Sequence, residues 1–340
     1  MRIALVTDAW WPQVNGVVRT LTMAVAELGR LGHVVETITP DLFTTVPCPS
    51  YPEIRLALAA GRGVRRRLES CRPDAIHIAT EGPLGWAARR WCIDQDLPFT
   101  TSFHTRFPNY LAVRTRLPAD LFWEPLRRFH GRAERVFVAT PTLEAELRGR
   151  GLTRLHRWGR GVDLGLFTPD GPRLSELDGV AGPILLHIGR VAPEKNIEAF
   201  LSVDVPGTKV VVGDGPALAT LRRRYPHALF LGALHGKRLA AAYRAADVFV
   251  FPSRTDTFGL VMAEALASGV PVAAFPVPGP LDVVTGGAGV LDEDLATAIR
   301  GALVLDRRDA TAAGRLFSWT RCTAQFLAGL VPVAPLPRAA

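Results

Sequence analysis

Short runs of apolar, mostly β-branched residues alternate along the chain with longer segments of helical periodicity. Strands that are apolar at nearly every position are typical of parallel sheets covered on both faces, so the alternation predicts doubly wound α/β domains with right-handed crossovers. In the first half, strands are expected at 2–7, 34–39, 75–79, 99–103 and 135–139, and helices at segments such as 17–31, 83–95 and 119–131.

The alternation starts again after a polar stretch rich in glycine and proline, DGPRLSELDGVAGP, at 170–183, which is typical of an interdomain linker. The 340 residues also suffice for two cores of about 150 residues. We therefore expect two Rossmann-like domains, 1–169 and 183–316, with ligands bound at the carboxyl ends of their strands. In the second domain, strands are expected at 184–188, 209–212, 229–231, 248–251 and 272–274, and helices at 196–202, 217–225, 237–245 and 260–268.

Composition indicates a globular protein, with 48% hydrophobic and 21% charged residues. The opening MRIALVTDAWW has one arginine, and Asp8 interrupts its apolar run, so a secretory signal is not expected. No run approaches the roughly 18 apolar residues of a membrane span. We expect a cytoplasmic protein. The four cysteines are scattered, which favours reduced thiols over disulfides or a zinc site: Cys48, Cys71, Cys92 and Cys322.

The net charge is +8, and residues 112–160 hold eleven arginines against five acids. Such a face suits phosphate, nucleic acid or an anionic leaflet, although a solvated surface is the simpler interpretation. Regularly spaced aromatics and RNA-module signatures are lacking, so no nucleic-acid partner is expected. The hypothesis that remains is peripheral contact with an anionic membrane, on the cytoplasmic face of the inner membrane. Its residues are Arg114, Arg116, Arg127 and Arg128, beside the apolar Leu117, Leu121, Phe122 and Trp123, which are expected to be exposed.

Two loops of the first domain carry candidate residues. Asn15 and Gly16 follow the first strand, where a tight turn would aim helix amides at an anion. This turn is not G-x-G-x-x-G, and no acid ends the second strand, which argues against NAD binding. His104 lies just past a buried strand and offers a donor near neutral pH. Asn-Gly is also a common turn, and a lone loop histidine is often structural.

In the second domain, GRVAPEKN at 189–196 places Gly189, Arg190 and Lys195 in a strand-to-helix loop. Two cations there suit the oxygens of a diphosphate, although a salt bridge from Lys195 to Glu194 or Glu198 is the alternative. The turn VGDGP at 212–216, with Gly213 and Asp214, is a weaker signal because many α/β turns look alike.

The most specific segment is FPSRTDTFGLVMAEALASGVP at 251–271, with Asp256 in the loop and Glu264 just over one turn inside the next helix. Phe258, Gly259 and Leu260 open that helix, where free amides can hold a phosphate. Glu264 could bind a ribose diol through both oxygens. The two acids could instead be helix caps and dipole partners.

With these motifs the chain resembles the retaining glycosyltransferases of family 4, over nearly its whole length. The likeness rests on G-R-x-x-x-E-K-N, V-G-D-G-P and P-S-x-x-(D/E)-x-F-G-L-x-x-x-E-A-x-A-x-G-x-P. The segments WWPQVNGVVRT and SFHTRFPNY resemble bacterial mannosyl- and glucosyltransferases that act on lipids. The resemblance implies a GT-B fold, in which two Rossmann-like domains face a central cleft. It also implies a closing helix, at about 317–330, that packs back on the first domain.

The resemblance also implies residue roles. Gly16 would lie beside the diphosphate or sugar, and His104 would contact the transferring sugar. Arg190 and Lys195 would neutralise the leaving diphosphate, and Glu264 would hold the ribose. Asp256 would bind hydroxyls of the donor sugar, but the family usually has glutamate there, so donor identity cannot be carried over.

These observations predict a retaining hexosyltransferase that uses a nucleotide-sugar of the GDP-mannose or UDP-glucose type. The acceptor would be a hydroxyl of a membrane glycolipid or diacylglycerol. No cofactor or metal is expected, because cations and helix amides would occupy the diphosphate site. The alternatives are a nucleotide-sugar epimerase or phosphorylase on the same fold, and a non-catalytic nucleotide or RNA binder.

Overall fold

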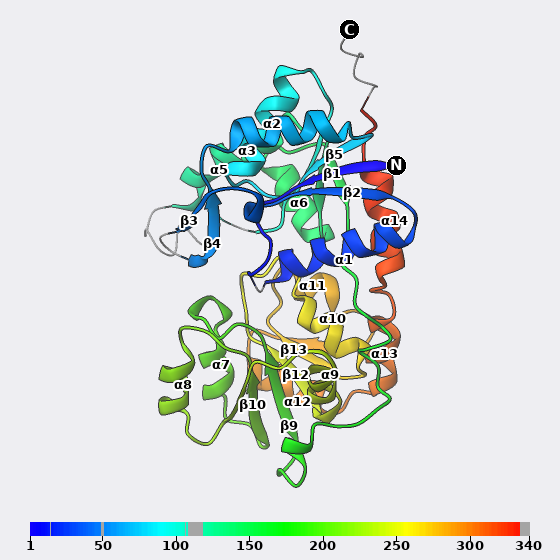
Figure 1. Cartoon of the computed structure of the whole chain (residues 1–340). Helices are drawn as coiled ribbons and strands as arrows, with labels where there is room; N and C mark the ends of the chain where they lie inside the picture. The colour runs from blue at the N-terminus through cyan, green and yellow to red at the C-terminus, as the bar shows by residue number, and fades with distance from the viewer. Residues whose placement is uncertain (14, 49–50, 106, 108–117, 334–340) are drawn as a thin grey trace. The chain divides into compact units, whose positions relative to one another are not determined.

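The structure is a computed structural model, and it describes residues 1–13, 15–48, 51–105, 107 and 118–333. The chain divides into two compact units. Unit 1 comprises Met1–Arg160 and Trp319–Ala340, and unit 2 comprises Gly161–Ser318. Each unit has a parallel six-stranded sheet of its own, with helices packed against it (Figure 1).

The sheet of unit 1 has the strand order β2-β1-β5-β6-β7-β8, and every neighbouring pair is parallel. The expected strands of this half are all present within a residue or two of their predicted ends. They are β1 (Arg2–Val6), β2 (Val34–Ile38), β5 (Ala75–Ile78), β6 (Thr100–Ser102) and β7 (Arg135–Val138), and the sheet is completed by β8 (Leu155–Arg157).

Both faces of this sheet are buried. On β1, Ala4 and Val6 belong to a core shared with α2, α3, α5 and α6, whereas Ile3 and Leu5 belong to a second core shared with α1 and α14. This two-sided burial is the reason for the nearly continuous apolar runs. The helices are α1 (Gly16–Arg30), α2 (Ala60–Cys71), α3 (Pro83–Asp94), α5 (Trp123–His130), α6 (Pro141–Gly149) and α14 (Trp319–Gly329).

Several elements of unit 1 were not among those expected. They are the antiparallel pair β3 (Thr45–Cys48) and β4 (Tyr51–Ala57), the edge strand β8, and the helices α2 and α6. Strand β8 reads Leu-His-Arg, so it lacks the apolar run that marks the central strands. Strand β3 contains Pro47, which is compatible with a strand only at an edge or bulge.

Unit 2 has the strand order β11-β10-β9-β12-β13-β14, and a core of buried apolar residues packs against this sheet. In chain order this is 3-2-1-4-5-6, the arrangement of dinucleotide-binding Rossmann sheets. The strands are β9 (Ile184–Ile188), β10 (Thr208–Val212), β11 (Leu229–Gly232), β12 (Val248–Phe251), β13 (Val272–Ala274) and β14 (Gly289–Leu291). The helices are α7 (Ile197–Ser202), α8 (Leu218–Arg224), α9 (Gly236–Ala245), α10 (Leu260–Ala267), α11 (Pro280–Val283), α12 (Leu295–Ala302) and α13 (Arg307–Gly314).

The boundary between the units lies after Arg160, earlier than the expected end at 169. The stretch at 170–183 packs on unit 2: the amide of Leu174 donates to the carbonyl of Ala241, and the Arg244 guanidinium donates to the carbonyl of Pro172. These hydrogen bonds hold the polar segment 170–183 against unit 2, an arrangement that its composition alone does not predict. At the other end, α14 packs against α1, and Arg135 of β7 donates to the carbonyl of Ala328 at 2.7 Å.

Candidate active site

The switch point of the unit 2 sheet brings together two of the predicted loops. Strand order reverses between β9 and β12, which are neighbours. Ligands of such sheets bind outside the carboxyl ends of the strands at this point. The loop after β9 carries Lys195, and the loop after β12 carries Asp256. The Nζ of Lys195 lies 2.5 Å from Oδ1 of Asp256.

This ion pair is only partly accessible, with 23% of the Lys195 side chain and 17% of the Asp256 side chain exposed. Burial opposes ionisation of Asp256, but the Lys195 ammonium outweighs burial and holds the pKa of that carboxyl below its usual value. Lys195 therefore contacts Asp256, and among the described residues neither Glu194 nor Glu198 forms an ion pair with it; Glu198 pairs with Arg224 instead. Arg190 lies exposed in the same loop.

The glycines of the next turn are required by the packing of two loops. Gly213 has a φ of 142°, and a Cβ there would lie 1.8 Å from the carbonyl oxygen of Gly189. A Cβ on Gly215 would lie 2.4 Å from the carbonyl oxygen of Val191. Asp214 accepts a hydrogen bond from the Gly215 amide at 2.7 Å, and its own carbonyl accepts from the Val191 amide. The VGDGP turn thus holds the loop after β9 in place.

The segment Phe258-Gly259-Leu260 sets the start of α10. Gly259 is left-handed, with a φ of 82°, and a Cβ there would lie 2.6 Å from the Met262 methyl group. Phe258 is buried against Phe317, with ring centroids 5.7 Å apart. Leu260 is the first residue of α10, so its amide and the next ones lie at the positive end of the helix dipole.

Glu264 lies one turn inside α10 and is buried, with 1% of its surface exposed. The hydroxyl of Tyr243, on α9, donates to its Oε2 at 2.9 Å. Sequence reasoning missed Tyr243, although it is the single aromatic residue in the alanine-rich helix GKRLAAAYRA. Its ring is fully buried between Phe167 and Phe249.

A second missed residue, His187, lies within β9, near enough to Lys195 and Asp256 for both charges to act on its pKa. Its Nδ1 lies 3.1 Å from the carbonyl oxygen of Val250, and a carbonyl only accepts, so Nδ1 carries the proton. Burial lowers the pKa of His187 to about 4, and the charge on Lys195 acts in the same direction. A neutral ring with an accepting Nε2 results. The sequence feature that could have indicated His187 is a polar residue inside the otherwise apolar strand ILLHI.

In unit 1, the expected anion turn is capped by its own side chain. Asn15 is the N-cap of α1, and its Oδ1 accepts from the amides of Val17 and Val18 at 3.0 Å. Its carbonyl accepts from the amide of Arg19. Gly16, the first residue of the helix, is exposed. The turn was expected to aim these amides at a ligand, but three of them are engaged by Asn15.

His104 is buried beside Arg160 and Trp158. The Arg160 Nη2 lies 3.0 Å from Nδ1 of His104, and a guanidinium only donates, so Nδ1 accepts and Nε2 carries the proton. Burial, and then the Arg160 charge, hold the pKa of His104 well below its usual value. His104 is therefore a neutral donor whose orientation is fixed, with its ring packed edge-on against Trp158.

Several arginines of the basic segment 112–160 are paired with acids or buried, so they are not all available to an anionic partner. Arg127 pairs with Glu124 at 2.9 Å and Arg150 pairs with Asp120 at 2.9 Å, while Arg160 is buried. Arg128 is exposed, Arg114, Arg116 and Leu117 lie outside the described residues, and Phe122 is partly buried. Leu121 is exposed, as expected.

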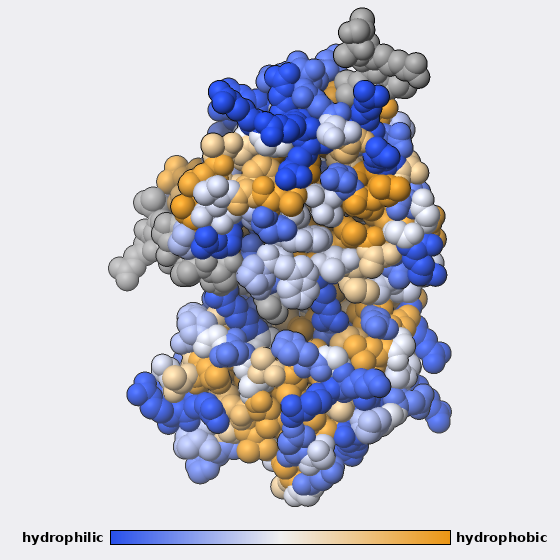
Figure 2. Space-filling model, in the orientation of Figure 1, coloured by the Kyte–Doolittle hydropathy of each residue, from blue (hydrophilic) through white to orange (hydrophobic). Residues whose placement is uncertain are grey.

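Trp123 was expected to be exposed, and this prediction was wrong. It is buried because it opens α5, stacks on Phe103 and lies 4.1 Å below the Arg150 guanidinium. In Figure 2, hydrophilic residues also gather over α2, a helix that the sequence did not single out; it exposes Arg62, Arg65 and Arg66.

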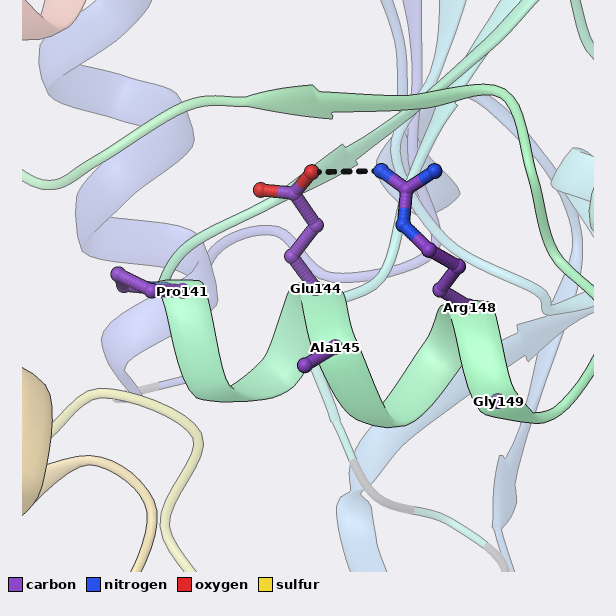
Figure 3. A pocket seen from close by; sticks show the side chains of 5 residues that line it. All are labelled: Pro141, Glu144, Ala145, Arg148 and Gly149. Carbon is purple, nitrogen blue, oxygen red and sulfur yellow. Dashed lines mark hydrogen bonds and ion pairs between the residues drawn. The ribbon is translucent and has the colours of Figure 1, made fainter.

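A surface hollow of about 470 Å³ lies beside α6 and is lined by none of the predicted site residues (Figure 3). It is lined by one helix, and its two charged side chains, Glu144 and Arg148, pair with each other at 2.9 Å. It lacks the convergent polar groups of a binding site, so the motifs and not this hollow define the candidate site.

Within the described ranges, no helix is long and apolar enough to span a bilayer. In the same part of the chain, no three His, Cys, Asp or Glu side chains come close enough to chelate one ion. The four cysteines are free thiols, and Cys71, Cys92 and Cys322 are buried.

Comparison with known proteins agrees with the motifs. Residues 14–166 match Glycosyltransferase Family 4, and residues 182–305 match Glycosyl transferases group 1. A GDP-mannose-dependent alpha-mannosyltransferase of Mycobacterium tuberculosis is 32% identical over 84% of this chain and 82% of its own length. The alpha-monoglucosyldiacylglycerol synthase of Streptococcus pneumoniae is 28% identical over 93% of this chain and 82% of its own length.

The fold is shared with sucrose-phosphate synthase from Thermosynechococcus elongatus. The TM-score is 0.75 at 23% identity, over 96% of this chain and 97% of that one. This likeness and the two Rossmann-like sheets confirm the GT-B fold class expected from the motifs. The chain belongs to the group 1 glycosyltransferases of family 4.

Proposed function

We propose that this glycosyltransferase transfers a hexose from a nucleotide-sugar to a hydroxyl of a membrane glycolipid or diacylglycerol. The transfer retains the anomeric configuration and requires no metal ion. The donor is of the GDP-mannose or UDP-glucose type, and the two relatives support these classes, since one is named for GDP-mannose and the other for monoglucosyldiacylglycerol. The higher identity to the first, 32% against 28%, favours GDP-mannose.

The observation that carries this proposal is the Lys195–Asp256 pair at the switch point of the unit 2 sheet. Its 2.5 Å contact joins the loops of two neighbouring strands, and α10 begins a few residues after Asp256. A diphosphate bound there meets the Lys195 ammonium and the first amides of α10, and Arg190 lies in the same loop. Glu264, oriented by Tyr243, is the group assigned to the ribose.

In the reaction, the bond between the sugar C1 and the phosphate oxygen breaks as the acceptor oxygen bonds to C1. The acceptor proton passes to the departing phosphate oxygen. Negative charge grows on the diphosphate, where preorganised cations and amides stabilise it most in the transition state. His104 offers its Nε2–H to a sugar hydroxyl without adding a charge.

Retention by double displacement would need a carboxylate placed as a nucleophile across from an acid, about 5–5.5 Å away. Asp256 is bound to Lys195, and Glu264 receives the Tyr243 hydroxyl. These contacts favour ligand-binding roles for both acids. Attack on the leaving-group face, with the departing phosphate as base, is the route that we propose instead.

Transfer should continue in excess EDTA. Metal-dependent transferases gather acids around a divalent ion at the diphosphate, whereas Lys195 and helix amides take that position here. The test incubates the protein with a panel of nucleotide-sugars and a total lipid extract, with and without EDTA, and follows glycolipid products by mass spectrometry. GDP-mannose is expected to give the largest product yield.

Other outcomes of this experiment contradict parts of the proposal. Complete loss of activity that added Mg²⁺ or Mn²⁺ restores would show that the phosphate site needs a metal. Conversion of the donor without a glycosylated acceptor would favour an epimerase or phosphorylase. Inverted linkage in the product, detected by NMR of the anomeric proton, would rule out the retaining route.

We also propose that unit 1 contacts an anionic membrane through Arg127, Arg128 and the exposed Leu121. Each cation near an anionic leaflet contributes about 1 kcal/mol, so replacing both arginines by serine should weaken vesicle binding about 10- to 30-fold. Co-sedimentation with phosphatidylglycerol-containing and neutral vesicles, at low and high salt, measures this effect.

The matched control replaces Arg222 and Arg223 by serine, which removes the same charge from exposed positions on α8. This variant should bind vesicles like the unaltered protein. Equal binding to neutral and anionic vesicles, or equal losses in the two double variants, would contradict the assignment of the surface.

A further inference from the structure

The segment 80–85, Thr-Glu-Gly-Pro-Leu-Gly, links β5 to α3 at the switch point of the unit 1 sheet. Strand order reverses between β1 and β5, which are paired in register. By the same rule that places the donor on unit 2, ligands of this sheet bind outside the carboxyl ends of these two strands. Glu81 is the acid that this loop carries.

Asp8, which follows β1, fixes the loop from one side. Its carboxylate accepts from the amides of Leu84 and Gly85 at 2.9 and 3.2 Å, at the start of α3. Its amide donates to the Thr80 hydroxyl at 2.6 Å. Burial raises the pKa of Asp8 to about 6, and the negative charge of Glu81 acts in the same direction.

The two glycines of the segment are required by this close packing. A Cβ on Gly82 would lie 2.4 Å from the Asp8 carboxyl carbon. A Cβ on Gly85 would lie 1.9 Å from the carbonyl oxygen of Thr80. Backbone and carboxylate therefore pack closely against the segment that carries Glu81, and they leave no room for a larger residue at either glycine.

The side chain of Glu81 is held from a second direction. Its Oε1 lies 3.1 Å from Nε2 of His130, on α5, and Nδ1 of His130 lies 2.9 Å from the Thr101 hydroxyl, on β6. The Glu81 side chain is 8% exposed and that of His130 is fully buried. A carboxylate accepts only, so Nε2 of His130 carries a proton.

Holding a carboxylate in this place is costly unless its remaining acceptor sites are used. Burial of an ionised group is unfavourable, and among the residues that the structure describes, the bond from His130 leaves further lone pairs of the carboxylate available. Low local polarity strengthens any hydrogen bond that a ligand donates to it. Adjacent hydroxyl groups are the donors that fit a carboxylate, whereas a phosphate would be repelled.

We propose that Glu81 binds hydroxyls of the acceptor, and that the part of the acceptor next to it is an uncharged polyol. This inference rests on the proposed glycosyl transfer. His130 is a positioning residue that orients the carboxylate. A neutral glycerol or sugar headgroup therefore meets this loop, and a phosphorylated headgroup is disfavoured.

The test compares Glu81→Gln with the unaltered protein. Glutamine keeps the size of the side chain and can still accept from His130 through its amide oxygen, but it removes the charge. The acceptor KM for diacylglycerol and monoglycosyl diacylglycerol should rise about tenfold, the equivalent of about 1.4 kcal/mol, while kcat and the donor KM stay within twofold. The unaltered protein should prefer these acceptors to D-inositol 3-phosphate and phosphatidylinositol by about tenfold in kcat/KM.

Two variants separate binding from structure. Glu134→Gln makes the same change at an exposed acid of unit 1 and should leave both KM values unchanged. Glu81→Asp keeps the charge but shortens the reach, and it should raise the acceptor KM less than Glu81→Gln does. Equal effects of Gln and Asp, with equal falls in Tm, would mean a structural role and would overturn the inference.

The failure of this inference is distinguishable from failure of the proposed function. Absence of transfer to any acceptor by the unaltered protein, with every donor tested, would count against the function itself. Transfer with an unchanged acceptor KM in Glu81→Gln, or a preference for phosphorylated acceptors, would overturn only the role of Glu81.

Discussion

Replacement of Lys195 by alanine is expected to lower kcat about 10²–10³-fold, as removal of a preorganised charge stabiliser does in other enzymes. Lys195 lies at the switch point of the unit 2 sheet with 23% of its side chain exposed, so its charge is poorly screened by water. Charge develops on the diphosphate mainly in the transition state, and the effect should therefore fall on kcat more than on donor affinity. Steady-state kinetics with a saturating acceptor would measure both parameters.

The interpretation needs controls, because Lys195 also neutralises Asp256. Its removal leaves a largely buried carboxylate unpaired, which lowers stability by itself. The double variant Lys195→Ala/Asp256→Asn should recover part of the lost Tm but not kcat. Lys237, exposed on α9, provides a matched lysine-to-alanine control that should be silent. Recovery of kcat along with Tm would show that Lys195 is a structural residue.

The second large effect is expected at Glu264. Glu264→Gln should weaken donor binding by roughly 1–3 kcal/mol, or about 5- to 150-fold in Kd, because hydrogen bonds from a ribose diol to a charged acceptor are lost. Tyr243→Phe removes the hydroxyl that orients this carboxylate at 2.9 Å, and a smaller loss in the same direction is expected. Titration calorimetry with nucleotide and nucleotide-sugar would give both Kd values.

Comparison of the two ligands separates the roles of the two acids. If Glu264 binds the ribose, Glu264→Gln weakens GDP and GDP-mannose equally. If Asp256 binds the sugar, Asp256→Asn weakens GDP-mannose and leaves GDP almost unchanged. If donor binding were unaffected by Glu264→Gln, the ribose assignment would be contradicted. Glu264 would then be a structural residue, in agreement with its burial at 1% exposed surface.

Much of the fold could be predicted locally, because central parallel strands are apolar on both faces. The strands around Ile3, Ile76 and Val250 were expected for this reason, and these three residues are buried. Edge elements such as β8 lack this signal, since one side of an edge strand has no neighbour. The chain divides after Arg160 rather than at the expected 169, and the polar stretch 170–183 packs on unit 2 through hydrogen bonds that composition does not encode.

The candidate site, like the fold, could be predicted from the sequence only in part. Glycine positions could be selected from the sequence, and close approach explains them: a Cβ on Gly213 would meet the carbonyl of Gly189. The contact between Lys195 and Asp256 could not be predicted, because it depends on the adjacency of β9 and β12, whose loops are 61 positions apart. The family resemblance indicated both residues, but it assigned Lys195 to the leaving diphosphate and Asp256 to the hydroxyls of the donor sugar.

Periodicity and the restart of the strand–helix alternation by themselves predicted the two Rossmann-like sheets, and the resemblance carried by the motifs predicted the family. Only the tertiary structure decided which side chains meet and which are buried. Trp123, expected at the surface, is buried under Arg150. Tyr243 and Glu81 became candidate site residues only because each forms a hydrogen bond with a buried residue of another element, Glu264 and His130 respectively. The reason is physical: backbone pattern is set by near neighbours in the chain, whereas burial and hydrogen bonding depend on residues that only folding brings together.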